Sequence, residues 1–290
     1  MFFHMQDLQF DAKPEGPDAA FANRLQEVLG GKWGEMTVAM QYLYQGWNAR
    51  LPGKYKDLLL ATGTEELGHV EMLCTMIARL LEGAPMSVQE TAQKNNPMLA
   101  AVYGASNPQH QIVNGAGAYP QDSQGVPWSG AFVTSSGNLL ADFQLNATAE
   151  MQGRLQVARL YEMTDDPGIK KLLRFLLARD HLHQQQWVAA AQEIKDDGLD
   201  GMPVPEAFPL EEEETGFAYQ VMNFSDGTSV GEGQWAGGPA PDGSGRDLEL
   251  VERPEAHGGR QTLPPGDPRL YGTPPGTTPG SATEAPTNAR

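Results

Sequence analysis

The chain has 290 residues, a net charge of −17 and an isoelectric point near 4.7. This charge argues against non-specific binding to nucleic acid or to an anionic membrane, because both require clustered Lys and Arg. The length allows one large domain or two small ones with a substantial core. No apolar run approaches the roughly 20 residues that span a bilayer.

The single cysteine, Cys74, cannot form an intrachain disulfide, which is consistent with a reducing compartment. Acidic residues follow the short apolar start of the chain within a few positions, so this start lacks the hydrophobic region of a signal peptide. We therefore expect a soluble cytoplasmic protein with no nucleic-acid or membrane partner. We expect Cys74 to pack in the core rather than to act as a catalytic thiol.

Two helices are predicted before residue 84. Residues 18–47 carry apolar side chains at helical spacing, with Asp18 as the N-cap, and predict one long helix. The Gly30-Gly31 pair within it costs about 1 kcal/mol per glycine relative to alanine, which allows a kink or a close helix contact there. A tight turn at residues 51–53 and a second helix over residues 54–83 complete an antiparallel hairpin.

A second hairpin is predicted after a long connection. Residues 84–135 contain repeated Gly and Pro breaks and predict an irregular crossover with room for one short helix. Residues 136–163 predict a third helix, and Asp166 and Pro167 begin a fourth that runs to about residue 195. Four long helices with this crossover predict an all-α, ferritin-like four-helix bundle. The predicted apolar faces include Trp47, Met151, Leu155 and Val188.

Beyond residue 197 the sequence becomes acidic and rich in Gly and Pro, and it has too few apolar residues to form a core alone. We therefore divide the chain into two parts. Residues 1–197 form a bundle with an extended N-terminal arm, residues 1–16, and residues 198–290 form an extended irregular tail. Aromatic anchors in residues 200–235 predict that this part wraps over the bundle or over a neighbouring subunit. The last 30 residues are expected to be loosely packed or disordered.

A glutamate and a histidine lie three residues apart in the second predicted helix. Glu66 and His69 are separated by about 60° around the helix, so they point the same way. Apolar residues recur through the same sector, which places the pair on a buried face. A buried carboxylate beside an imidazole needs a counter-charge. One such pair is weak evidence for a metal, since many surface helices carry one.

The chain contains the pattern twice. In each hairpin a Glu on the first helix is followed 30 or 31 residues later by an acid, which precedes a His by three residues. The six side chains are Glu35, Glu66, His69, Glu150, Asp180 and His183. They reproduce the ligand scheme of ferritin-like dimetal proteins, with Asp in place of one Glu. Three Glu carboxylates and two neutral imidazoles carry a charge of −3, which two divalent ions and one hydroxide would balance. The alternative is a bundle whose polar residues are solvated or satisfy one another.

At these residues the sequence resembles the manganese catalases, a non-haem dimanganese family, over about residues 1–235. The segments that carry the resemblance are Trp33-Gly34-Glu35, Glu65-Glu66-Leu67-Gly68-His69, residues 150–154, residues 163–167 and residues 178–183. The resemblance implies two manganese ions per subunit, which cycle between divalent and trivalent states while hydrogen peroxide is disproportionated. It also implies a homohexamer with tails that cross between subunits.

The resemblance assigns a role to each ligand. Glu66 would bridge both ions, Glu35 and His69 would complete one ion, and Glu150 and His183 would complete the other.

Three further residues would act around these ligands. Asp180, where the family usually has Glu, would handle protons. Arg154, one turn after Glu150, is a candidate for the basic residue that lies next to the ligands in this family. Tyr42 would donate a hydrogen bond to the site, with a purely packed core aromatic as the alternative.

The resemblance also suggests a calcium ion between subunits. Asp57 and the tail residues Asn223, Ser225 and Gly227 match its oxygen ligands. Ala61 stands where a second Asp is expected, so one ligand is missing. A turn at residues 223–227 without an ion is the alternative.

Carboxylate and imidazole ligands suit manganese and iron alike. Two other functions therefore stay open from the residues alone: a di-iron oxidase or oxygenase, and a ferritin-like storage or coat protein without rapid turnover.

Overall fold

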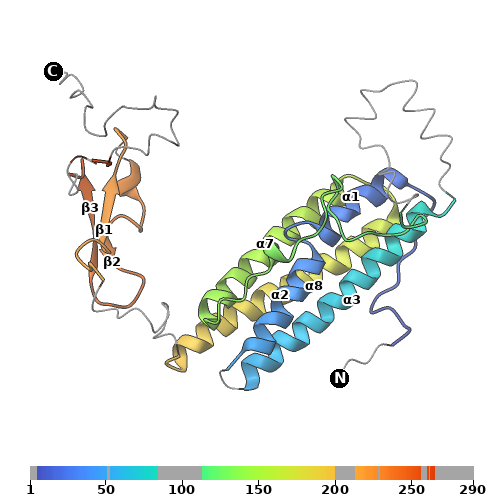
Figure 1. Cartoon of the computed structure of the whole chain (residues 1–290), viewed down its shortest axis with the longest axis horizontal. Coiled ribbons are helices and arrows are strands. Elements are labelled where there is room, and N and C mark those ends of the chain that lie inside the picture. The colour runs from blue at the N-terminus through green and yellow to red at the C-terminus, as the bar shows by residue number, and fades with distance from the viewer. Residues whose placement is uncertain are drawn as a thin grey trace, which may run out of the picture. The chain divides into compact units, whose positions relative to one another are not determined.

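A computed structural model of the protein describes residues 5–50, 53–83, 113–199, 213–227, 229–255, 260 and 262–264. The chain divides into two compact units, Met1–Phe208 and Pro209–Arg290. The first unit is helical and the second carries a small sheet (Figure 1). The predictions for most of the crossover and for the last 30 residues largely concern residues outside these described ranges.

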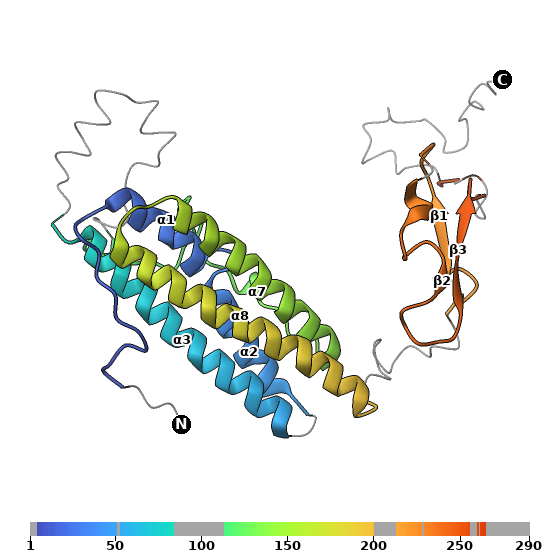
Figure 2. The same ribbon diagram turned by 180° about the vertical axis from the view of Figure 1, so that it is seen from behind.

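The first unit is an all-α bundle, as predicted. Its helices are α1 (Ala19–Gly30), α2 (Glu35–Asn48), α3 (Gly53–Leu81), α7 (Leu139–Glu162) and α8 (Pro167–Asp196). Helices α1 and α2 follow one another along α3, while α7 and α8 pair with each other (Figures 1 and 2). No helix within the described ranges combines the length and the apolar character needed to cross a membrane.

The prediction of one helix over residues 18–47 is wrong, because residues 31–34 separate α1 from α2. The break lies where the chain approaches itself closely. A Cβ atom added to Gly30 would lie 2.5 Å from the carbonyl oxygen of Gln121, and one added to Gly34 would lie 2.8 Å from that of Leu29. As a result Glu35 becomes the first residue of α2, where the positive end of the helix dipole favours a carboxylate.

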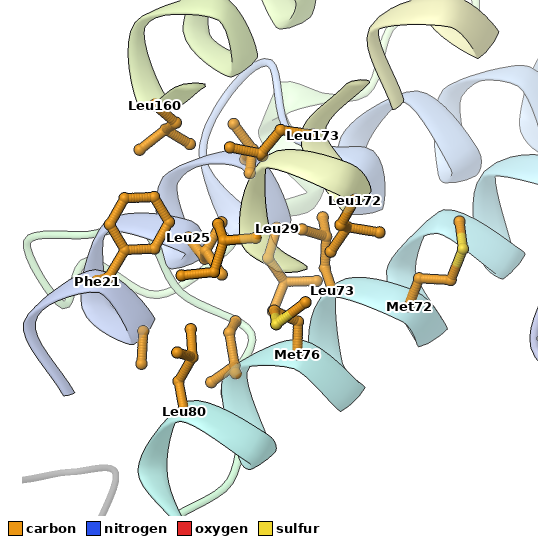
Figure 3. Packing of buried hydrophobic residues seen from close by; sticks show 14 of the residues in the cluster. Phe21, Leu25, Leu29, Met72, Leu73, Met76, Leu80, Leu160, Leu172 and Leu173 are labelled. Carbon is orange, nitrogen blue, oxygen red and sulfur yellow. The ribbon is translucent and has the colours of Figure 1, made fainter. Parts of the chain in front are cut away.

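Two hydrophobic clusters fill the interior. One joins α1, α3, α7 and α8, and Figure 3 shows its packing around the labelled residues Phe21, Leu25, Leu29, Met72, Leu73, Met76, Leu80, Leu160, Leu172 and Leu173. The other joins α2, α3, α7 and α8 around Tyr42, Tyr55, Phe143 and Trp187. Along α3 and α8, the polar segments 66–69 and 180–183 lie between the parts that enter these two clusters.

Four residues predicted on buried faces are instead exposed: Trp47, Met151, Leu155 and Val188. The inner face of α7 explains the error for that helix, because it contains the polar residues Asp142, Asn146 and Glu150 together with apolar ones. Apolar periodicity alone therefore places the buried stripe of α7 on the wrong sector.

Buried glutamines hold the end of the crossover against the bundle. The Gln26 amide donates to the Tyr119 carbonyl at 2.5 Å and accepts from the Tyr119 N–H at 3.0 Å. Thr134 donates its N–H to Gln41 at 3.1 Å and accepts from Gln45 at 2.9 Å. The described part of the crossover contains the short helix η1 (Gly130–Phe132) and is otherwise irregular, as expected.

The second unit differs from the predicted irregular tail because it contains strands. They are β1 (Gln220–Asn223), β2 (Gly238–Pro239) and β3 (Asp247–Glu252), in the order β1-β3-β2. β1 runs parallel to β3, and β2 runs antiparallel to it. Residues 247–250 alternate acidic and leucine side chains, a period-two signal that the composition of the tail obscures. Wrapping of residues 200–235 over a bundle stays a prediction.

Candidate metal centre

Six polar side chains meet inside the bundle between the two hydrophobic clusters. They come from four helices and are at most 6% exposed: Glu35 from α2, Glu66 and His69 from α3, Glu150 from α7, and Asp180 and His183 from α8. These are the six residues that the repeated sequence pattern singled out.

Glu66 is shared by two groups of potential ligands. Ligand atoms of Glu35, Glu66 and His69 lie within 4.8 Å of one another, and so do those of Glu66, Glu150 and His183. One oxygen of Glu66 lies 2.7 Å from Nδ1 of His69, and the other lies 2.7 Å from Nδ1 of His183. The carboxylate thus presents one oxygen to each half of the site, which is the arrangement that a bridging ligand requires.

The outer carboxylates complete two similar halves. Glu35 Oε2 lies 3.6 Å from Nδ1 of His69, and Glu150 Oε1 lies 3.8 Å from Nδ1 of His183. The two imidazole rings are nearly parallel, with centroids 5.7 Å apart.

The residues present fit a pair of cations. Within the described part of the chain, both oxygens of Glu66, both ring nitrogens of His69 and His183, and Oδ1 of Asp180 are buried without a hydrogen bond. Each buried polar atom left without a partner costs about 1–3 kcal/mol. Carboxylate oxygens and imidazole nitrogens are suitable ligands for manganese or iron, and two cations would satisfy these atoms and offset the buried negative charge.

The buried acids bind protons with different strength. Burial, together with the charge of Glu66, raises the pKa of Glu35 to about 8. Burial also raises the pKa values of Glu150 and Asp180 well above their ordinary range, with further contributions from neighbouring carboxylates. Burial opposes the ionisation of Glu66 as well, but the imidazoles beside it hold its pKa below the usual range.

The pKa values of both histidines are raised, although burial alone would lower them. Burial by itself would lower the pKa of His183, but Glu65 and Glu66 raise it to about 10. Burial likewise acts against the charge on His69, but Glu66 raises its pKa well above 6.5. In the metal-free protein the site therefore holds several protons near neutral pH, which bound cations must displace.

Tyr42 hydrogen-bonds to a potential ligand. Its hydroxyl is buried and donates to Glu150 Oε1 at 2.6 Å, and the indole N–H of Trp187 donates to the same oxygen at 3.4 Å. The sequence analysis assigned Trp187 no role in the site. Its contact with Glu150 depends on the packing of α8 against α7.

Arg154 and Asp180 differ in how they approach the ligands. The Arg154 guanidinium donates at 2.7 Å to the side chain of Gln184, which is the residue after His183. Asp180 lies within the electrostatic reach of Glu35 and Glu66, and its Oδ1 is buried without a hydrogen bond among the described residues.

Comparison with known proteins identifies the family. Residues 1–286 match the family described as manganese-containing catalase. The chain belongs to this family. A manganese catalase from Bacillus subtilis is 52% identical over 276 residues, covering 95% of this chain and 99% of the relative. The manganese catalase from Lactiplantibacillus plantarum is 46% identical, covering 93% and 98%.

A solved structure agrees with the assignment. The crystal structure of KatB, a manganese catalase from Anabaena, superposes with a TM-score of 0.67 at 26% identity, covering 88% of this chain and all of that one. Membership in the manganese-containing catalases confirms the predicted ferritin-like bundle, the oxidoreductase class and manganese as the implied metal.

The predicted calcium ligands lie in different units. Asp57 is an exposed residue of α3, whereas Asn223, Ser225 and Gly227 belong to the second unit. The tail residues form a hydrogen-bonded turn: Asn223 donates to the Gly227 carbonyl at 3.1 Å, and its own side-chain oxygen accepts from the Ser225 N–H at 2.9 Å. This is the turn that the sequence analysis gave as the alternative, and calcium binding stays a prediction.

The sequence analysis gave no role to Glu65 or to the residues that contact it. Glu65 lies behind both histidines, and Arg179 donates two hydrogen bonds to it, at 2.6 and 3.1 Å. Burial opposes ionisation of Glu65, but His183, His69 and Arg179 hold its pKa well below the ordinary range. Its position one residue before Glu66 was the available signal, but the sequence does not show which way its side chain points.

Proposed function

We propose that the protein disproportionates hydrogen peroxide to water and oxygen at two manganese ions. The observation that carries the proposal is the pair of buried ligand groups that share Glu66. When bound, the ion pair supplies a store for two electrons by cycling between divalent and trivalent states. One peroxide is oxidised to oxygen and releases two protons and two electrons. A second peroxide takes up two protons and two electrons and forms two waters.

Five side chains would hold the ions. Glu66 would contribute an oxygen to each ion, Glu35 and His69 would complete one position, and Glu150 and His183 would complete the other. The Nδ1–oxygen distances of 2.7 Å between Glu66 and each histidine support this division. The apolar clusters on either side exclude water from the site and so strengthen every charge interaction within it.

Asp180 is proposed to store a proton between the two half-reactions. Its buried Oδ1 has no hydrogen bond within the described residues, and burial raises the pKa of the carboxyl group well above its ordinary range, which favours the protonated form. Tyr42 would keep Glu150 in place through the hydrogen bond from its hydroxyl. Arg154 stays a weaker candidate, because its hydrogen bond goes to Gln184 and so reaches the ligands only through that residue.

Metal analysis combined with oxygen evolution tests the proposal. We expect two manganese ions per chain and one oxygen molecule for every two peroxides consumed, with no haem. We expect His69→Ala and His183→Ala each to empty at least one metal position while the bundle stays folded, because most of its core is apolar.

Three results would reject parts of this assignment. Full metal occupancy in either histidine variant contradicts the ligand set. A manganese-loaded protein that evolves no oxygen favours a storage or coat protein. Activity that requires iron and molecular oxygen favours a di-iron oxidase.

Two finer features are also proposed from the resemblance. The protein is proposed to form a homohexamer in the cytoplasm, with a calcium ion between subunits whose ligands are Asp57 and the tail segment 223–227. Removal of calcium by a chelator should then dissociate the oligomer before the bundle unfolds, since these ligands lie outside the helical core. Sedimentation with and without the chelator measures this, and an unchanged oligomer with no bound calcium favours the simple turn.

A further inference from the structure

Glu65 faces the outer nitrogen atoms of both histidines. Its Oε2 lies 3.2 Å from Nε2 of His183, and its Oε1 lies 3.8 Å from Nε2 of His69. The inner nitrogen of each ring, Nδ1, lies 2.7 Å from Glu66. Each imidazole therefore lies between Glu66 on the side of the proposed ions and Glu65 on the opposite side.

The outer nitrogens need an acceptor. A neutral imidazole that binds a metal through Nδ1 carries its proton on Nε2, and the partner of that proton sets the tautomer and the ring orientation. In the described residues both Nε2 atoms are buried and no hydrogen bond satisfies them. The Glu65 carboxylate is near both, with a different oxygen closest to each ring.

Glu65 is itself held rigidly. Arg179 donates from Nε to Oε1 at 2.6 Å and from Nη2 to Oε2 at 3.1 Å, so its planar fork fixes both carboxylate oxygens. Gln9 adds a third hydrogen bond, from Nε2 to Oε1, at 2.8 Å. The Arg179 side chain comes from α8 and Gln9 from the N-terminal arm, which runs beside α3 (Figure 2).

The arm also contacts a residue that packs against the site. Phe10 stacks on Phe175 with ring centroids 4.4 Å apart, and Phe175 meets the His69 ring edge-on at 6.3 Å. Glu65 is thus held by groups from α8 and the arm, which lie far from it in sequence, and Phe175 of α8 packs against the His69 ring.

We propose that Glu65 is a shared positioning residue that holds both histidines with Nδ1 towards the metal pair. The inference rests on the proposed function, because it assumes that His69 and His183 are ligands. A single carboxylate that serves both rings makes the two metal positions interdependent. Loss of Glu65 therefore weakens both positions together, unlike loss of a ligand that belongs to one of them.

Manganese binding to the full-length protein tests this inference. Bound manganese per chain is measured against free Mn²⁺, and the fold of each metal-free variant is checked by circular dichroism. We expect Glu65→Ala to reduce the affinity at both positions by about 10- to 100-fold, the usual effect of losing such a partner. Glu65→Gln keeps one acceptor oxygen but turns a donor towards the other ring, so we expect it to split the binding curve into two separate steps.

Asp11→Asn is the matched control. Like Glu65→Ala, it removes a carboxylate that pairs with an arginine. The pair is Asp11 of the arm with Arg79 of α3, at 2.6 Å, and it involves neither histidine. We expect this variant to bind manganese as the unaltered protein does.

The inference is overturned if Glu65→Ala binds two ions with unaltered affinity, if it loses only one position, or if Asp11→Asn loses as much. If Glu65→Ala does not fold, Arg179→Gln replaces it as the test, because this variant keeps Glu65 but removes the two hydrogen bonds from the Arg179 guanidinium. We expect a smaller loss at both positions there, and unchanged binding rejects the proposal. An unaltered protein that fails to bind two ions rejects the proposed function as well.

Discussion

The metal-free protein is expected to lose stability as the pH rises from 6.5 to 8. Glu35 has a folded-state pKa of about 8 against an ordinary 4.5, so between these values the folded protein holds a proton that the unfolded chain has released. His183 behaves in the same way between 6.5 and about 10. Since the folded state binds more protons, raising the pH through these windows favours unfolding.

The magnitude follows from the number of protons. One proton of difference changes the free energy of unfolding by about 1.4 kcal/mol per pH unit. The windows of Glu35 and His183 overlap between pH 6.5 and 8. His183 is still partly protonated in the unfolded chain at the lower end, and Glu35 is partly ionised in the folded protein at the upper end, so the predicted combined loss is about 2 kcal/mol per pH unit. The raised pKa values of Glu150 and Asp180 act in the same direction.

Urea unfolding of the metal-free protein, followed by helical circular dichroism at several pH values, measures this slope. Glu35→Gln removes one titrating group and should reduce the slope by about 1 kcal/mol per pH unit on average over this window. Glu193→Gln, an exposed carboxylate of α8 that pairs with Lys54, should leave it unchanged. A stability that rises between pH 6.5 and 8, or a slope that Glu35→Gln does not alter, refutes the reasoning. Manganese affinity should rise over the same range, because the ions displace the protons.

Three further perturbations have defined outcomes. Tyr42→Phe removes the 2.6 Å hydrogen bond to Glu150, which is worth about 1.5–3 kcal/mol for a charged acceptor. In a binding titration this variant should bind manganese about 10- to 100-fold more weakly at one of the two positions. Equal binding at both positions contradicts this. Gly30→Ala should lower the melting temperature, because its Cβ meets the Gln121 carbonyl at 2.5 Å, whereas Gly16→Ala, with nothing within 4 Å, should not. Manganese at 100 times its dissociation constant should add about 2.7 kcal/mol per site to the free energy of unfolding, and an unchanged denaturation curve argues against specific binding.

The six side chains that meet in the candidate metal centre could be singled out from the sequence because their signal is local. A carboxylate three residues before a histidine shares a helix face with it, and Glu35 and Glu150 repeat at nearly equal distances before the two pairs. The bundle was predictable for a similar reason, since apolar periodicity and caps such as Asp166 depend on neighbouring residues alone.

The surroundings of the ligands were decided by tertiary packing. Glu65 and Arg179 are separated by 114 residues, and no spacing rule pairs them; they meet because α3 and α8 adjoin in the folded bundle. The break between α1 and α2 likewise depends in part on Gln121, which comes from the distant crossover. Helical periodicity can tell which side chains share a face, but the partner that this face meets is set by how distant segments pack, and that information is not local in the chain.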